Sequence, residues 1–207
     1  MADHFVRRWI VWVSAGESVG FLAPALAFVI SVQFILPALP LLVIGGATEG
    51  AVLGTAQATV LRGVLPALRS GRWIGGTAIA AALAWLIGQW LAETSPALSE
   101  SSLPLLVVLA GLGAPVLLAS IGFAQWIELR HHVERAGRWI LGSAVAWLVG
   151  LAVFFAVASP LWRTGQSMAL VVAIGVLAGV LMAVGMASVT GGVMRMLLRS
   201  RLTAPVG

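Results

Sequence analysis

The sequence predicts an all-α fold: a polytopic transmembrane bundle of six helices, built from three parallel-related two-helix hairpins. Three observations predict it. The 207-residue chain is 60% hydrophobic and only 9% charged, whereas soluble domains carry about 25% charged residues. Six segments are apolar enough to cross a bilayer, and short motifs return in each pair of segments. A water-soluble protein is therefore excluded, and residues 1–207 are expected to form a single membrane domain.

Each predicted span meets the requirement of about 20 mainly apolar residues. The six segments are Trp9–Ile30, Ala38–Leu61, Trp73–Ala92, Leu103–Leu129, Trp139–Ala158 and Met168–Leu198.

The arginines predict the orientation. Both termini and the links 62–72 and 130–138 together hold every arginine except Arg163. Because basic residues favour the cytoplasmic side, both termini are expected in the cytoplasm. This topology also accounts for the sequence pI of about 11.7, so nucleic acid is not expected as a partner.

The spans form three pairs with shared motifs. An Arg-Trp-Ile triplet opens each pair, and a Leu-Arg dipeptide closes it. The repeat units are approximately 7–64, 71–132 and 137–201, and units of two spans all insert in the same direction. Such units can be related by an axis along the membrane normal, which predicts a pseudo-threefold bundle. Tryptophan and arginine favour the headgroup level, so the motifs predict interface anchors at Trp9, Trp73, Trp139, Arg62, Arg130 and Arg199.

Small residues form stripes along the second span of each pair. Such stripes let helices approach closely in lipid. A second interpretation is a groove for a flat lipid or pigment. The glycines concerned are Gly46, Gly50, Gly54, Gly122, Gly175, Gly179 and Gly191.

One of these motifs carries a resemblance. The pattern Gly-x-x-x-Gly-x-x-Gln-x-x-x-Leu-Arg runs from Gly50 to Arg62, and part of it recurs from Gly122 to Arg130. It resembles a family of bacterial six-span membrane proteins with repeated hairpin motifs. The resemblance implies that fold for nearly the whole chain and a place in the bacterial cytoplasmic membrane, but no particular activity.

Two acidic residues lie at membrane depth in the first hairpin. Glu17 follows Trp9 by about 12 Å of helix, and Glu49 precedes Arg62 by about 20 Å. A charge near the bilayer centre costs about 3 kcal/mol on insertion scales, and the matching positions of the other hairpins are apolar. These acids are therefore candidates for binding a proton, a cation or a polar ligand. Alternatively, each acid is neutral, is hydrogen-bonded to Ser14, Ser18, Thr48 or a neighbouring helix, or faces an arginine of a partner subunit. Their difference in depth argues against direct pairing.

Other polar residues have simpler expected roles. Gln57 and Gln125 occupy matching positions; they are candidates for the same ligand, with an interhelical hydrogen bond as the main expectation. Gln89 is also expected to form an interhelical hydrogen bond. Glu128 is expected to form an ion pair with Arg130 near the membrane surface.

Residue types that are absent exclude much chemistry. The chain has no cysteine, lysine or tyrosine, and its three histidines lie outside the predicted spans. Thiolate metal sites, Schiff-base cofactors and intramembrane serine–histidine catalysis are therefore not expected. No metal, cofactor or enzymatic activity is predicted, although bound lipid or pigment is compatible with the sequence.

Three functions are compatible with these observations. The first is an accessory or scaffold subunit of a larger membrane complex, with lipids and other integral membrane subunits as partners. The second is a small transporter, or its substrate-binding membrane component, that uses Glu17 and Glu49. The third is a lipid or pigment carrier that uses the glycine-lined grooves.

Overall fold

The computed structural model describes residues 2–202, and within them every regular element is a helix. The elements are α1 (Ala2–Gly20), α2 (Leu22–Phe34), α3 (Ala38–Leu61), α4 (Ser70–Ser101), α5 (Leu103–Leu129), α6 (Arg138–Leu161) and α7 (Met168–Leu202). Together α1 and α2 make one candidate membrane span, and each further helix makes one, which gives six. The predicted helical bundle with six spans is therefore present. Residues 1 and 203–207 of the predicted domain lie outside the described part.

The first span is broken in the middle, where the sequence predicts one continuous segment. A turn at Phe21 separates α1 from α2. Pro24 has no backbone N–H, so it removes one helical hydrogen bond at this point and favours a kink. The proline also packs closely on α3, because a Cβ at Gly45 would lie 2.8 Å from the Pro24 Cα.

The third span extends beyond its predicted end at Ala92. Helix α4 continues to Ser101, and only Ser102 separates it from α5. Polar side chains at the start of this extension bond along the helix: Glu93 Oε1 accepts a hydrogen bond of 2.8 Å from Nε2 of Gln89, one turn earlier. Gln89 therefore bonds within its own helix, and the interhelical bond expected for it is not formed. Because the helix satisfies its own polar groups, it continues past the apolar segment.

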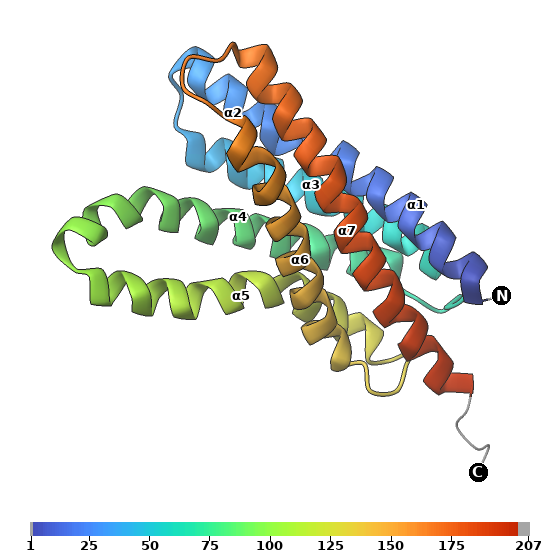
Figure 1. Cartoon of the computed structure of the whole chain (residues 1–207). Helices are drawn as coiled ribbons and strands as arrows, with labels where there is room; N and C mark the ends of the chain where they lie inside the picture. Colours follow the sequence, from blue (N-terminus) through green and yellow to red (C-terminus); the bar gives the residue numbers. More distant parts are fainter. Residues whose placement is uncertain (1, 203–207) are drawn as a thin grey trace.

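The helices form a closed ring. Each helix packs against the next in the order α1, α3, α4, α5, α6 and α7, and α7 packs against α1. At one end of the molecule the helices lie together, whereas at the other the α4–α5 hairpin diverges from α2 and from the α6–α7 connection (Figure 1). The closed ring gives the bundle an axis that all six spans can line.

Glycines bring neighbouring helices of this ring into close contact. A Cβ at Gly50 would lie 2.6 Å from the Ala81 Cβ, and one at Gly54 would lie 3.0 Å from the Ile74 Cα. In the same way Gly122 packs on α6, Gly179 on Phe21 and Gly191 on Trp9, while Gly46 and Gly175 face the rings of Trp85 and Trp162. The seven glycines of the stripes thus pack against neighbouring parts of this chain.

Candidate functional site

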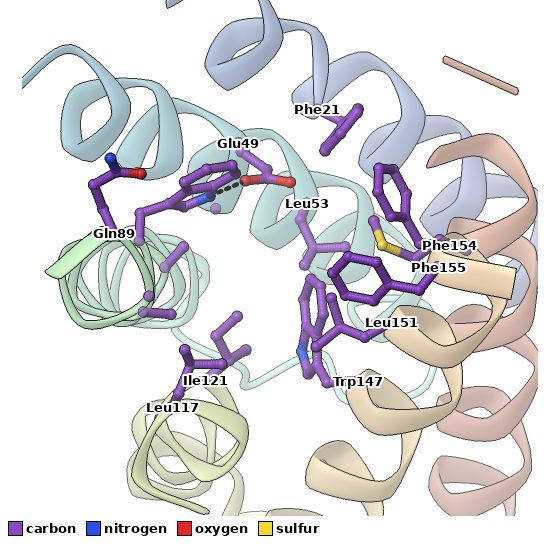
Figure 2. Close-up of a pocket in the computed structure, with 16 residues that line it drawn as sticks. Phe21, Glu49, Leu53, Gln89, Leu117, Ile121, Trp147, Leu151, Phe154 and Phe155 are labelled. Carbon is purple, nitrogen blue, oxygen red and sulfur yellow. Dashed lines mark hydrogen bonds between the residues drawn. The ribbon is translucent and has the colours of Figure 1, made fainter. Parts of the chain in front are cut away.

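A cavity of about 470 Å³ lies on the axis of the bundle. Its lining comes from α3, α4, α5, α6 and α7, and from Phe21 between α1 and α2. Trp147, Phe154 and Phe155 of α6 face Leu117 across the hollow (Figure 2). The wall is almost entirely apolar, and ligand pockets of proteins commonly have volumes of about 300–1,000 Å³. This space is large enough for a small organic molecule.

Glu49 is the acidic group in the cavity wall. It lies on α3 and is 5% exposed. Its Oε2 accepts a hydrogen bond of 2.6 Å from the indole Nε1 of Trp85 on α4 (Figure 2). Gly46 and Gly50 flank the glutamate and permit the close approach of α4. The small residues of α3 therefore explain how an indole reaches this carboxylate.

Glu17 lies beside Glu49 without a hydrogen-bond partner. It is fully buried, and neither carboxyl oxygen has a partner among the described residues. Its helix packs directly on α3, since a Cβ at Gly20 would lie 3.0 Å from the Glu49 carbonyl oxygen. The two carboxyl groups are neighbours that interact electrostatically. Glu17 is outside the cavity lining, whereas Glu49 belongs to it.

The depth estimate from the sequence argues against this pairing, and the structure corrects it. That estimate measures Glu17 from Trp9 and Glu49 from Arg62, as if both reference residues lay at one level of the membrane. The packing of α1 on α3 instead fixes the register through Gly16 and Gly20. Among the described residues, the hydrogen bonds expected between these acids and Ser14 or Thr48 are also absent, because the two hydroxyls bond to the backbone carbonyls of Ala183 and Ile44.

Three tryptophans fill the core next to the cavity. The structure differs here from the prediction of interface anchors, because Trp9, Trp73 and Trp139 are fully buried. The Trp139 ring lies 6.1 Å from that of Trp9 and 6.2 Å from that of Trp73, measured between centroids. Each indole N–H has an acceptor, which removes the usual cost of burying it. The anchor interpretation is wrong because the motif directs these rings inward.

Gln57 and Gln125 supply two of these acceptors. Trp73 Nε1 donates to Gln57 Oε1 at 3.1 Å, and Trp139 Nε1 donates to Gln125 Oε1 at 2.9 Å. Gln125 Nε2 donates to Gln57 Oε1 at 2.7 Å and to Thr77 Oγ1 at 3.0 Å. Both glutamines thus form the interhelical bonds expected of them. They lie outside the cavity lining, so the structure does not bring them together with Glu49 as ligand-binding groups.

The arginines of the motifs lie on the side of the tryptophan core that faces away from the cavity. Arg62 and Arg199 are exposed, and the Arg130 guanidinium lies 5.1 Å from the centroid of the Trp126 ring. Glu128 does not pair with Arg130 as predicted. It is buried and instead bonds to the backbone N–H of Arg69 and to His132 Nε2, both at 2.9 Å. The link before α4 folds over this carboxylate, which the linear sequence does not reveal.

No protein-family model, curated protein or solved structure matches the chain. The site is therefore defined by its geometry. In the part of the chain that the structure describes, no three His, Cys, Asp or Glu side chains cluster in a way that could hold a metal ion.

Sequence reasoning missed the aromatic part of the site. Trp85 and Trp147 lie within apolar spans and belong to no motif, so their residue type does not distinguish them from lipid-facing residues. One signal was available for Trp147: counted from the repeated motifs, it occupies the position of Glu17 in the third unit. The structure places this position next to the axis.

Proposed function

We propose that the protein is a membrane-embedded binding component, acting alone or in a small transporter, whose ligand occupies the axial cavity. The cavity is the observation that carries the proposal. Its wall is apolar and aromatic, and Glu49 offers one carboxylate at its edge. A largely apolar molecule with one polar or cationic group matches this distribution. No enzymatic reaction, metal or resident cofactor is part of the proposal.

Two side chains with polar head groups, Glu49 and Gln89, line the cavity, and the Gln89 amide nitrogen donates to Glu93 within its own helix. Trp85 donates to Glu49 Oε2, and among the described residues no group donates to Glu49 Oε1. An oxygen of this kind can accept a bond from an ammonium or hydroxyl group, and burial in a low-dielectric wall strengthens such a bond. The surrounding rings of α6 add stacking surface and can attract a cation. Together the carboxylate and the aromatic rings would orient the ligand in the cavity and contribute to its binding affinity.

We also propose that the bundle is a pseudo-threefold arrangement of three hairpins. The equivalent contacts Trp73 to Gln57 and Trp139 to Gln125 support it, as does the matching approach of Gly54 and Gly122 to the following hairpin. The third unit has Met194 at the glutamine position. Its tryptophan partner from the first unit therefore uses another acceptor on α7: Trp9 Nε1 donates to Thr190 Oγ1 at 3.0 Å.

Glu17 and Glu49 have no acidic counterparts in the other two hairpins. Glu17 and Glu49 break a symmetry that the other two hairpins keep with apolar side chains, and three of these four apolar counterparts line the cavity. The counterparts of Glu17 are Ala81 and Trp147, and those of Glu49 are Leu117 and Met186. A purely structural bundle does not require such a break, so the pair supports a binding role.

The orientation proposed from the arginines places both termini in the cytoplasm of a bacterial cell. Under this orientation the tryptophan core lies toward the cytoplasm, and the diverging ends of the hairpins lie toward the opposite side.

The alternatives from the sequence are less well supported. The glycine stripes are occupied by helices and rings of this chain, which leaves little groove for a lipid or pigment there. The accessory-subunit interpretation remains a prediction: it requires copurification with other membrane subunits in a fixed ratio. The axial cavity supports a binding function, and no comparable feature of the described residues supports a scaffold function.

The experiment compares small molecules that copurify with two leucine variants. Gly88 lines the cavity, and a Cβ there would meet only Leu117 Cδ1 at 3.6 Å, so Gly88→Leu fills empty space without displacing a helix. Gly111→Leu is the control, because a Cβ at Gly111 has no neighbour within 4 Å. Mass spectrometry of gently solubilised protein should detect the same bound molecule in wild type and Gly111→Leu. It should be depleted at least tenfold in Gly88→Leu, and equal amounts in all three proteins would contradict the proposal.

A further inference from the structure

Glu17 has a buried carboxyl group with no partner to balance a charge. Both of its oxygens are inaccessible and unbonded among the described residues. An unpaired charge at such a position is expensive, because neither water nor a positive group stabilises it. The group therefore requires either a proton or a cation.

Among the described residues, the groups that surround Glu17 supply no positive charge. Helix α1 packs against α2, α3 and α7, and the titratable neighbour of Glu17 on them is Glu49. Arg195 of α7 instead forms an ion pair of 3.2 Å with Asp3 at the other end of α1. Around Glu49, helix α4 contributes the Trp85 indole, while Glu93 of that helix bonds to Gln89. Two adjacent carboxylates without a counterion repel each other strongly in a medium of low dielectric.

One proton resolves this repulsion. A protonated carboxyl gives its neighbour a hydrogen-bond donor and leaves the pair with a single negative charge. A metal ion is a poorer match, since among the described residues only two carboxylates converge here, and hard cations prefer about six oxygen ligands or more. The Trp85 indole stabilises the remaining charge on Glu49 by donating to it.

We propose that Glu17 and Glu49 share one proton, and that the positive charge of a ligand in the cavity replaces it. This rests on the proposed binding function and assigns the ligand to the class of lipophilic cations. When the ligand binds, the O–H bond of the pair breaks and the proton passes to water. The cation enters beside Glu49, and no other bond is made or broken. The charge of the occupied site is the same before and after the exchange.

The geometry divides the two roles between the acids. Glu49 contacts the cavity, so it faces the cation, whereas Glu17 lies outside the lining and acts on the ligand through Glu49. Glu49 is thus the binding residue and Glu17 the positioning residue that keeps a proton on the pair. Without Glu17, the remaining carboxylate has no like-charged neighbour and no longer needs the shared proton.

The test measures proton release together with binding. Tetraphenylphosphonium serves as the cationic probe, and triphenylphosphine oxide serves as a neutral aromatic probe. Calorimetric titration of full-length protein in detergent, in two buffers of different ionisation enthalpy, counts the protons released per probe bound. Infrared spectroscopy follows the C=O stretch of a protonated carboxyl group without any probe. Glu134→Gln is the matched control, because Glu134 is exposed in the link between α5 and α6.

We expect wild type and Glu134→Gln to bind the cation with release of about one proton, and the neutral probe with none. Glu49→Gln should weaken cation binding at least tenfold and leave the neutral probe unaffected. Glu17→Gln should still bind the cation but release much less than one proton. The protonated-carboxyl band should be present in wild type, fall when the cation is added, and disappear in the double glutamine variant.

Each failure points to a different error. Cation binding without proton release in wild type overturns the exchange, while the proposed binding function stands. Full proton release by Glu17→Gln overturns the role of Glu17. If neither probe binds, the binding function fails for these chemistries, and the exchange fails with it. Should a variant not fold, wild type still decides, because a spectrum without a protonated-carboxyl band refutes the shared proton.

Discussion

The glutamine pair at the tryptophan core gives the sharpest stability prediction. Gln57→Leu keeps a similar volume but removes the acceptor of two interhelical hydrogen bonds. Trp73 Nε1 then loses its partner entirely, whereas Gln125 Nε2 keeps its bond to Thr77 Oγ1. The substitution therefore leaves the buried Trp73 N–H without an acceptor and removes one of the two acceptors of the Gln125 amide nitrogen.

The expected cost is about 2 kcal/mol of unfolding free energy. A buried donor without a partner costs about 1–3 kcal/mol. Interhelical bonds in membranes average about 0.6 kcal/mol in double-mutant cycles and reach about 1.7. The orphaned indole provides the larger part, because Trp73 is fully buried and water cannot replace the lost acceptor.

Equilibrium unfolding in mixed micelles measures this free energy, with helix content as the signal. Gln89→Leu is the control, since it makes the same substitution where the lost bond is exposed and lies within one helix. We expect the control to change stability by less than about 0.5 kcal/mol. The cycle with Gln125→Leu should be non-additive by about 1 kcal/mol, because the two glutamines bond directly.

A Gln57→Leu variant as stable as wild type would show that the lost acceptor of Trp73 carries no cost in unfolding free energy. Strict additivity of the two leucine substitutions would mean that the two side chains do not share a bond. Equal losses of unfolding free energy in Gln57→Leu and Gln89→Leu would show that burial of the hydrogen bond does not determine how much stability is lost.

Two further predictions concern packing and topology. Gly50→Leu should lower the unfolding free energy by about 3 kcal/mol, because its Cβ would lie 2.6 Å from the Ala81 Cβ; Gly75→Leu, with no neighbour within 4 Å, should be far milder in the same assay. The chain has no cysteine, so single cysteines report the topology without background. In intact cells an impermeant maleimide should modify Thr164→Cys between α6 and α7, but His131→Cys between α5 and α6 only after permeabilisation. The reverse pattern would contradict the proposed orientation.

Much of the candidate site could be inferred from residue type alone. A glutamate in an apolar segment is conspicuous because lipid cannot solvate its charge, and this marks Glu17 and Glu49 without any structure. The glutamines are recognised in the same way, and their partners follow from the need to satisfy a buried amide. Trp85 could not be recognised, because an indole is equally compatible with lipid, a helix interface or a cavity wall. Trp147 is marked only by its match to the Glu17 position in the repeat.

The helical class, the six spans and the positions where polar groups enter the membrane can be predicted from the residue order alone. These follow from local composition, since a backbone in lipid must satisfy its own hydrogen bonds. Helix packing sets the order of the helices in the ring and the adjacency of Glu17 and Glu49. It also directs three tryptophan rings inward, those of Trp9, Trp73 and Trp139. Periodicity says which residues share one helix face, but not at what height two helices meet. That height is set by close contacts such as Gly20 on Glu49, and they exist only when the helices pack.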